Sequence, residues 1–186
     1  MAKLLLAEEW AGPGPLVIQL EDALPETYII VSRPTVHGCE LDAVVVGPQA
    51  LFVLHEQDGS PSGQEGPVPD AGRRAREATA ALGAFFRDEF ADLWPPLRHL
   101  VVLTAAEATV DRAMDTPLPM TTLNTVAEAI ASADVPDGEP LLDKGSRETV
   151  AVALRDRRLT ASQRASQPFV FRTGDTFGSG KEVWTI

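Results

Sequence analysis

The sequence predicts an α/β fold, a mixed β-sheet flanked by helices, from three observations. Short aliphatic and β-branched runs, typical of strands, alternate along the chain with segments of helical periodicity. Two of these runs, 41–46 and 51–54, are joined by a turn-rich tetrapeptide and predict a β-hairpin. A long helical pattern over 73–93 separates this hairpin from a further strand. An all-α or all-β fold is difficult to reconcile with this order of elements.

The first predicted elements are a short helix and a strand. A Gly-Pro-Gly-Pro segment precedes a helical pattern at 16–24, which Pro25 ends because proline cannot continue a helix. A β-branched run at 28–32 predicts a strand. The hairpin follows, and since its strands are apolar at nearly every position, we expect both of its faces to be buried.

A loop and the long helix come next. Gly, Pro, Ser and acidic residues dominate 59–72 and predict a mobile loop. Apolar residues recur at helical spacing over 73–93, and Pro95-Pro96 stops the pattern. Residues 97–104 predict a further strand.

Two more helices complete the expected domain. Thr122 is the expected N-cap of a helix that continues to Ala133, and Ser146 the expected N-cap of a helix that continues to Arg155. These features predict one domain over residues 1–155.

A C-terminal extension over 156–186 follows this domain and is expected to be a linker to, or the start of, a further domain. Within it, 159–165 predicts a short helix and 169–186 predicts a strand pair around Gly174–Gly180.

The net charge of −11 is unevenly distributed along the 186 residues. Residues 1–143 carry 8 basic and 23 acidic side chains, a net charge of −15, whereas residues 144–186 carry 8 basic and 4 acidic side chains, a net charge of +4. An acidic surface disfavours binding to nucleic acid or to an anionic membrane, because phosphate contacts need basic side chains. The basic end is therefore the expected contact with a nucleic acid or a partner protein, through Arg155, Arg157 and Arg158.

The cysteine content and the hydropathy pattern limit the class of protein. The single cysteine, Cys39, excludes an internal disulfide and a zinc site built from a cysteine cluster. No apolar run has the length of a membrane span, and the N-terminal three-leucine run is too short for a signal peptide. We therefore expect a cytoplasmic protein that has no contact with a membrane.

The hairpin turn also predicts which polar side chains come together. If the turn is centred between Pro48 and Gln49, residues whose numbers sum to 97 lie opposite one another. Asp42 then faces His55 and Glu40 faces Gln57, all four on one face of the hairpin. Two interpretations remain open: the strands end in solvent, or Asp42 and His55 bind a divalent metal with Glu40 or Gln57 in support.

Basic side chains stand at two further places in the sequence. Arg73, Arg74 and Arg76 open the long helix, where a solvated first turn is favoured over a phosphate site. His99 lies in a predicted strand among apolar neighbours, which favours a structural role.

Segments 24–28, 40–48 and 51–54 resemble the NERD (nuclease-related) domain, whose fold is similar to that of PD-(D/E)xK, or restriction-endonuclease-like, nucleases. The likeness continues as a matching order of elements to about residue 155. The family pattern has an acid and an aspartate on the first hairpin strand and Glu-x-Lys on the second, where the carboxylates hold Mg²⁺ and the lysine stabilises charge.

Only one of these catalytic positions is preserved in this chain. Asp42 matches the aspartate, but His55 stands at the glutamate position and Gln57 at the lysine position. A glycine-glutamate pair typical of the first helix falls near Gly14-Pro15, where no acid is present. Neutral Gln57 supplies no positive charge to a developing phosphorane, so a large electrostatic contribution to catalysis is lost.

The resemblance thus implies a degenerate, non-catalytic binding or regulatory module that needs no cofactor, in a bacterial antiphage defence protein. One alternative is a weak nuclease that uses Mg²⁺ or Mn²⁺ at Asp42 and His55. Another is a structural adaptor or a homodimerisation domain. NERD domains occur ahead of protein kinases, and 177–183 is similar to the start of such a module, so the chain can be part of a longer protein.

Overall fold

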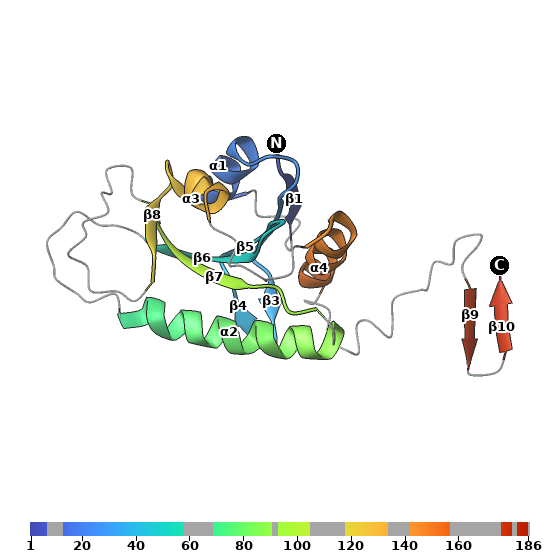
Figure 1. The fold of residues 1–186 in the computed structure, drawn as a ribbon. Coiled ribbons are helices and arrows are strands. Elements are labelled where there is room, and N and C mark those ends of the chain that lie inside the picture. The colour runs from blue at the N-terminus through green and yellow to red at the C-terminus, as the bar shows by residue number, and fades with distance from the viewer. Residues whose placement is uncertain are drawn as a thin grey trace, which may run out of the picture.

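A six-stranded mixed sheet forms the centre of the computed structural model, with the strand order β1-β2-β5-β6-β7-β8 (Figure 1). The structure describes residues 1–6, 13–57, 69–90, 93–104, 118–133 and 142–156, and the backbone of 176–179 and 182–185. The strands of the sheet are β1 (Lys3–Leu6), β2 (Ile29–Ser32), β5 (Ala43–Val46), β6 (Leu51–Gln57), β7 (Leu97–Leu103) and β8 (Met120–Thr122). Strands β2, β5 and β6 are antiparallel to their neighbours in this series, whereas β1 runs parallel to β2, and β7 and β8 run parallel to β6.

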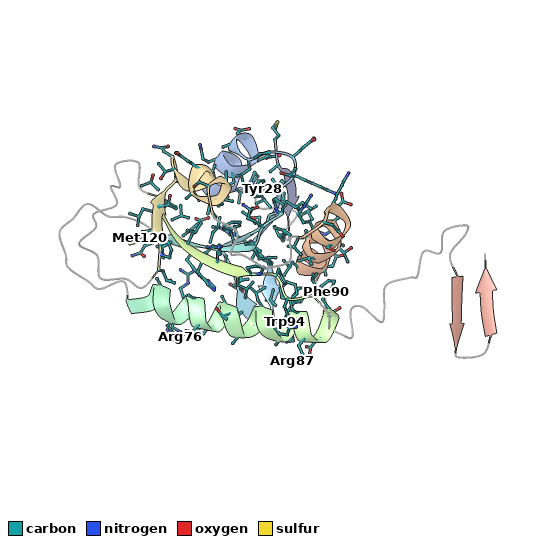
Figure 2. The ribbon with its side chains drawn as sticks, viewed as in Figure 1. Tyr28, Arg76, Arg87, Phe90, Trp94 and Met120 are labelled. Atoms are coloured by element: carbon teal, nitrogen blue, oxygen red, sulfur yellow. The ribbon has the colours of Figure 1, made fainter. Side chains whose placement is uncertain are left out.

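Helices cover both faces of this sheet, so the predicted α/β class is confirmed. One face carries α1 (Pro15–Ala23) and α3 (Val126–Ala131), and the other carries α2 (Pro69–Glu89) and α4 (Lys144–Asp156), as Figure 1 shows. Each face has its own apolar core, because successive side chains of a strand point to opposite faces. Arg76 and Arg87 lie on the outer side of α2, away from the sheet (Figure 2).

The predicted hairpin and its register are confirmed. Ala43 pairs with Leu54 and Val46 pairs with Leu51, so the paired residue numbers sum to 97. Every residue of β5, and β6 from Leu51 to His55, is buried, as the apolar runs predicted.

Hydrogen bonds join the hairpin turn to residues on the face of the sheet that carries α1 and α3. The Gln49 amide donates hydrogen bonds to the Tyr28 hydroxyl (2.9 Å) and to the Ile130 carbonyl (3.1 Å). Gly47 lets the Tyr28 ring approach, because a Cβ at this position would lie 2.8 Å from Tyr28 Cε1.

The long helix is shifted toward the N-terminus relative to its prediction over 73–93. It begins at Pro69, so the loop predicted over 59–72 is wrong in its last residues. Proline suits the first turn of a helix because its missing N–H would have no partner there. The helix ends at Glu89, and the Phe90 and Leu93 amides donate to the Phe86 and Phe90 carbonyls in a closing turn.

The two predicted helix caps are also wrong. Thr122 belongs to strand β8, where it pairs with Leu103, and the N-cap of α3 is Thr125. Ser146 lies inside α4, and the Asp143 carboxylate accepts a hydrogen bond from the Ser146 N–H (2.7 Å), which is the capping contact. Pairing with β7, which the local sequence does not show, extends the sheet to Thr122.

The structure also contains strands that the sequence patterns did not indicate. The N-terminal three-leucine run forms β1, and β3 (Thr35–Val36) pairs with β4 (Cys39–Glu40) in a separate two-stranded sheet. His37 and Gly38 make the turn between β3 and β4 with φ values of +47° and +78°, which is typical of a two-residue hairpin loop.

Two predictions concern the C-terminal extension. A strand pair is present, since β9 (Thr176–Ser179) and β10 (Glu182–Thr185) are antiparallel, but its expected centre is wrong, because β9 lies within 174–180. The short helix predicted over 159–165 lies outside the described residues. The boundary near residue 155 stays a prediction, although α4 ends at Asp156. None of the helices in the described part of the chain combines the length and apolarity needed to cross a membrane.

Candidate functional site

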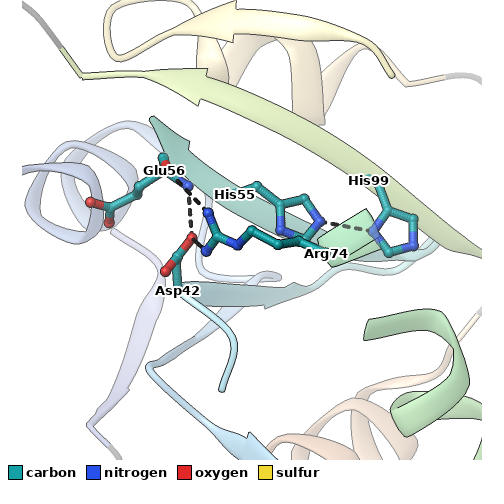
Figure 3. Close-up of polar contacts among 5 residues, drawn as sticks. All are labelled: Asp42, His55, Glu56, Arg74 and His99. Atoms are coloured by element: carbon teal, nitrogen blue, oxygen red, sulfur yellow. Dashed lines mark hydrogen bonds and ion pairs between the residues drawn. The ribbon is translucent and has the colours of Figure 1, made fainter. Parts of the chain in front are cut away.

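Asp42 lies just before β5, at the end of the hairpin opposite the turn. Its Oδ2 accepts a hydrogen bond from the Glu56 N–H at 2.9 Å and forms an ion pair with Arg74 Nη2 at 2.5 Å (Figure 3). Arg74 Nη1 reaches the Glu56 carbonyl at 3.5 Å, which closes a ring of contacts. The Asp42 and Arg74 side chains are 29% and 34% exposed, so the pair is partly shielded from water. The carboxylate therefore already has a cationic partner.

Arg74 reaches this carboxylate because α2 lies across the same face of the sheet. Helix α2 buries Ala75, Ala78, Leu82 and Phe86 against that face, which directs Arg74 along the sheet toward the end of β6. The solvated position favoured for Arg74 from the sequence is thus wrong. Arg73, by contrast, forms an exposed pair with Glu77 (2.8 Å) one turn along the helix.

His55 is the most deeply buried polar residue of the site, with 3% of its surface exposed. Its Nε2 lies 3.1 Å from His99 Nδ1 on the neighbouring strand β7, as Figure 3 shows. The two rings are nearly parallel, with an interplanar angle of 9° and a centroid distance of 5.4 Å. His99 Nε2 in turn lies 2.9 Å from Thr79 Oγ1 on α2.

These contacts define one direction of proton donation. Thr79 Oγ1–H donates to the Ala75 carbonyl (2.8 Å), so the oxygen must accept from His99 Nε2–H. His99 Nδ1 then carries the lone pair, and His55 Nε2–H must donate to it. The chain of hydrogen bonds leaves the lone pair of His55 Nδ1 without a hydrogen-bond partner among the residues that the structure describes.

Both imidazoles are held neutral at physiological pH. Burial, followed by the proximity of His99 and Arg74, lowers the pKa of His55 from 6.5 to about 4, although Asp42 acts in the opposite direction. Burial also lowers the pKa of His99. The direction of hydrogen-bond donation from His55 to His99 and from His99 to Thr79 requires that both rings be neutral.

The four residues predicted to cluster are only partly brought together. Asp42 and His55 lie at the same end and on the same face of the hairpin, but His55 bonds to His99 rather than to Asp42. Gln57 contributes its carbonyl, which accepts from the Thr104 amide (3.0 Å) and hydroxyl (3.3 Å). The prediction that Glu40 faces Gln57 is wrong, because Glu40 pairs with Thr35 in the β3–β4 sheet.

The sequence interpretation missed the contributions of Arg74 and Thr79 to this site. Position in the chain gave no sign of them, because both act across the interface between α2 and the sheet. His99 was given only a structural role, and its contact with His55 depends on the parallel register of β6 and β7, in which Val53 pairs with His99.

The donor set does not fit the magnesium ion that the resemblance implies. In the described ranges, no group of three or more His, Cys, Asp or Glu side chains could hold a metal ion. Among the described residues, Asp42 is the carboxylate at the expected metal position, it faces the Arg74 guanidinium, and the Nε2 of His55 is committed to His99. Mg²⁺ prefers several hard oxygen ligands, which this arrangement does not offer.

The predicted basic contact surface is described at one of its three arginines. Arg155 lies in the last turn of α4, where its Nε donates to Asp156 Oδ1 at 2.6 Å. Arg157 and Arg158 lie outside the described residues.

The chain matches no protein-family model, no curated protein and no solved structure.

Proposed function

We propose that the chain is a nuclease-related domain of the PD-(D/E)xK type that has kept the fold and lost the reaction, and that it acts as a binding or regulatory module. The observation that carries this proposal is the ion pair between Asp42 and Arg74. The setting that the resemblance implies, a bacterial antiphage defence protein in the cytoplasm, is part of the same proposal.

The order of elements supports the fold assignment within this proposal. Helix α1 precedes the antiparallel strands β2, β5 and β6, and α2 then connects β6 to the parallel strand β7. This is the order that the sequence resemblance implies, and it puts Asp42 immediately before the start of the second of these strands and His55 near the end of the third.

The chemistry of the site supports the loss of the reaction. A hydrolytic site needs a free carboxylate for a metal ion and a cation beside the developing negative charge. Here the cation, Arg74, neutralises the carboxylate itself. His55 is neutral and its Nε2–H bonds to His99, and Gln57 carries no charge.

A cleavage assay separates this proposal from a weak nuclease. Supercoiled plasmid and single-stranded DNA are incubated with the protein in Mg²⁺ and in Mn²⁺, beside an Asp42→Ala variant whose fold is checked by circular dichroism. We expect no cleavage above that of the variant. Cleavage that the substitution abolishes would contradict the proposal and favour a metal-dependent nuclease at Asp42 and His55.

A binding assay tests the role of the basic end. Fluorescence anisotropy with labelled DNA is measured over a salt series for the wild type and for a variant with Arg155, Arg157 and Arg158 replaced by glutamate. A variant with Arg73, Arg76 and Arg87 of α2 replaced by glutamate changes the net charge equally and serves as the matched control. We expect the first variant alone to bind more weakly, with a smaller salt dependence.

Equal affinity of the two variants for DNA would show that the basic end does not contact DNA. If the wild type binds no DNA, the module acts on a partner protein or on a second copy of itself. Sedimentation of the wild type over a concentration series then tests the homodimer.

A further inference from the structure

A hollow of about 340 Å³ lies at the end of the sheet opposite Asp42. It is lined by the first residues of β1 and β2, by the segment before β2, and by the first turns of α4: Lys3, Glu26, Thr27, Ile29, Lys144, Arg147 and Glu148. Ile29 stands at the start of β2, whereas Asp42 lies beside the other end of that strand, where its carbonyl accepts from the Arg33 amide. The hollow is therefore separate from the candidate site described above.

Three cationic side chains converge on this hollow within an otherwise acidic part of the chain. Lys3 comes from β1, and Lys144 and Arg147 come from α4, so the fold brings them together from opposite ends of the domain. Arg147 is fixed by a hydrogen bond from Nη1 to the Leu142 carbonyl at 2.6 Å. Neither lysine forms an ion pair with any residue that the structure describes. Their charges are available to a ligand.

Hydrogen-bond acceptors stand beside these cations. The carboxylates of Glu26 and Glu148 line the hollow, and neither is in an ion pair within the described part of the chain. Thr27 adds a hydroxyl, and Ile29 supplies an apolar floor. A hollow lined by both charged donors and carboxylate acceptors suits a molecule with an anionic group and several hydroxyl groups.

The size of the hollow limits the ligand further. Ligand pockets span about 300–1,000 Å³, so a hollow of this volume is at the small end of that range and suits a small molecule. Lysine and arginine side chains bind phosphate groups through charge-assisted hydrogen bonds.

We propose that this hollow binds a small phosphate ester that carries sugar hydroxyl groups, with Lys3, Lys144 and Arg147 on the phosphate and Glu26 and Glu148 on the hydroxyls. The phosphate can come from a free sugar phosphate or from a nucleoside monophosphate. The site does not depend on the function proposed for the Asp42 end of the sheet.

Isothermal titration calorimetry with four probes tests the proposal. Ribose 5-phosphate and adenosine 5′-monophosphate represent the two sources, and ribose and inorganic phosphate represent their parts. We expect saturable binding of at least one ester and weaker binding of both parts. Binding of adenosine 5′-monophosphate alone assigns the ligand to nucleotides, and equal binding of both esters assigns it to the shared ribose phosphate.

Variants of exposed residues locate the binding without disturbing the fold. Lys3→Gln and Lys144→Gln together are expected to weaken ester binding by at least about tenfold, because charge-assisted hydrogen bonds are lost. Arg76→Gln and Arg87→Gln together remove the same charge from the outer side of α2 and are expected to leave the affinity unchanged. Glu26→Gln is expected to weaken ribose 5-phosphate binding more than phosphate binding.

Three results would overturn the proposal. The first is the absence of saturable binding of either ester to the wild type. The second is equal affinity of the lysine variant and the α2 variant. The third is tighter binding of a 5′-phosphorylated oligonucleotide than of either ester, which would reassign the hollow to a nucleic-acid end.

Discussion

Asp42 is held by two donors from different parts of the chain, the Arg74 guanidinium and the Glu56 N–H. The sequence predicted where this aspartate stands in the hairpin, because the register follows from a four-residue turn. It did not predict its partner, because an arginine in a helix reaches a strand end only through tertiary packing. At the scale of single residues, His55 and Gln57 depart from the nuclease pattern. They are also residues whose contacts, with His99 and Thr104, the sequence did not predict.

Removing the carboxylate should cost more stability than removing an exposed arginine. Asp42→Ala leaves the Glu56 N–H and the Arg74 guanidinium without this acceptor in a partly shielded position, so we expect the free energy of unfolding to fall by about 1–3 kcal/mol. Arg73→Ala removes an exposed i,i+4 ion pair with Glu77, and such a pair contributes less than about 0.5 kcal/mol. Urea unfolding measures both, and equal losses would refute the anchoring role of Asp42.

The stability of the protein should rise with pH through the titration of His55. The native pKa of about 4 lies below the ordinary 6.5, so the unfolded state binds more protons between these values. This stability is fully present above about pH 6.5, and up to about 3 kcal/mol of it is lost as the pH falls toward 4. Burial of His99 acts in the same direction.

The free energy of unfolding, measured in urea over a pH series, tests this expectation through its slope against pH. His55→Gln should flatten the rise between pH 4.5 and 6.5, whatever its effect on overall stability. Arg76→Gln, on the exposed outer side of α2, is the control and should keep the wild-type slope, since arginine does not titrate in this range. A wild-type slope in the His55 variant would contradict the assignment.

At the scale of elements, local patterns predicted most of the central αβ unit. The apolar runs of β2, β5, β6 and β7 and the helical periodicity of α1 and α2 are strong, because these elements are buried on long stretches. Strand β8 was missed because it is three residues long and is defined by pairing with β7. The contact of His55 with His99 was missed for the same reason, since parallel pairing joins segments that are distant in sequence.

Two glycines should respond in opposite ways to alanine. Gly47→Ala puts a Cβ 2.8 Å from the Tyr28 ring, and the overpacking should destabilise the hairpin by about 1–3 kcal/mol. Gly83→Ala adds a Cβ in open space within α2 and should stabilise the protein by about 0.5–1 kcal/mol. The midpoints of urea unfolding check both, and destabilisation by Gly83→Ala would contradict the placement of α2.

At the scale of the whole molecule, the charge changes sign at the start of α4, so the basic part of the chain includes the last helix of the domain as well as the extension. Residues 1–143 carry a net charge of −15 and include both cores except the buried side chains of α4, whereas 144–186 carry +4. An acidic domain around an ion-paired Asp42 disfavours a polyanionic substrate. Function at the C-terminal quarter or at the hollow beside α4 is consistent with this distribution.

Truncation after Asp156 should leave the domain intact. Both apolar cores lie within residues 2–154, so we expect the shortened chain to unfold cooperatively with an unchanged m value in urea. A broadened transition or a lower m value would show that the extension belongs to the folded unit, against the predicted boundary near residue 155.

The most direct test of the account is whether Asp42 can hold a divalent cation while Arg74 is present. Mn²⁺ is titrated into ¹⁵N-labelled wild type and into Arg74→Ala, and paramagnetic broadening of the backbone amides is followed by NMR. If Arg74 neutralises the carboxylate, the amides of Asp42 and Glu56 broaden no more than those of exposed acidic residues in the wild type. Selective broadening of these two amides in the wild type would contradict the account and restore a metal-dependent reaction as the function.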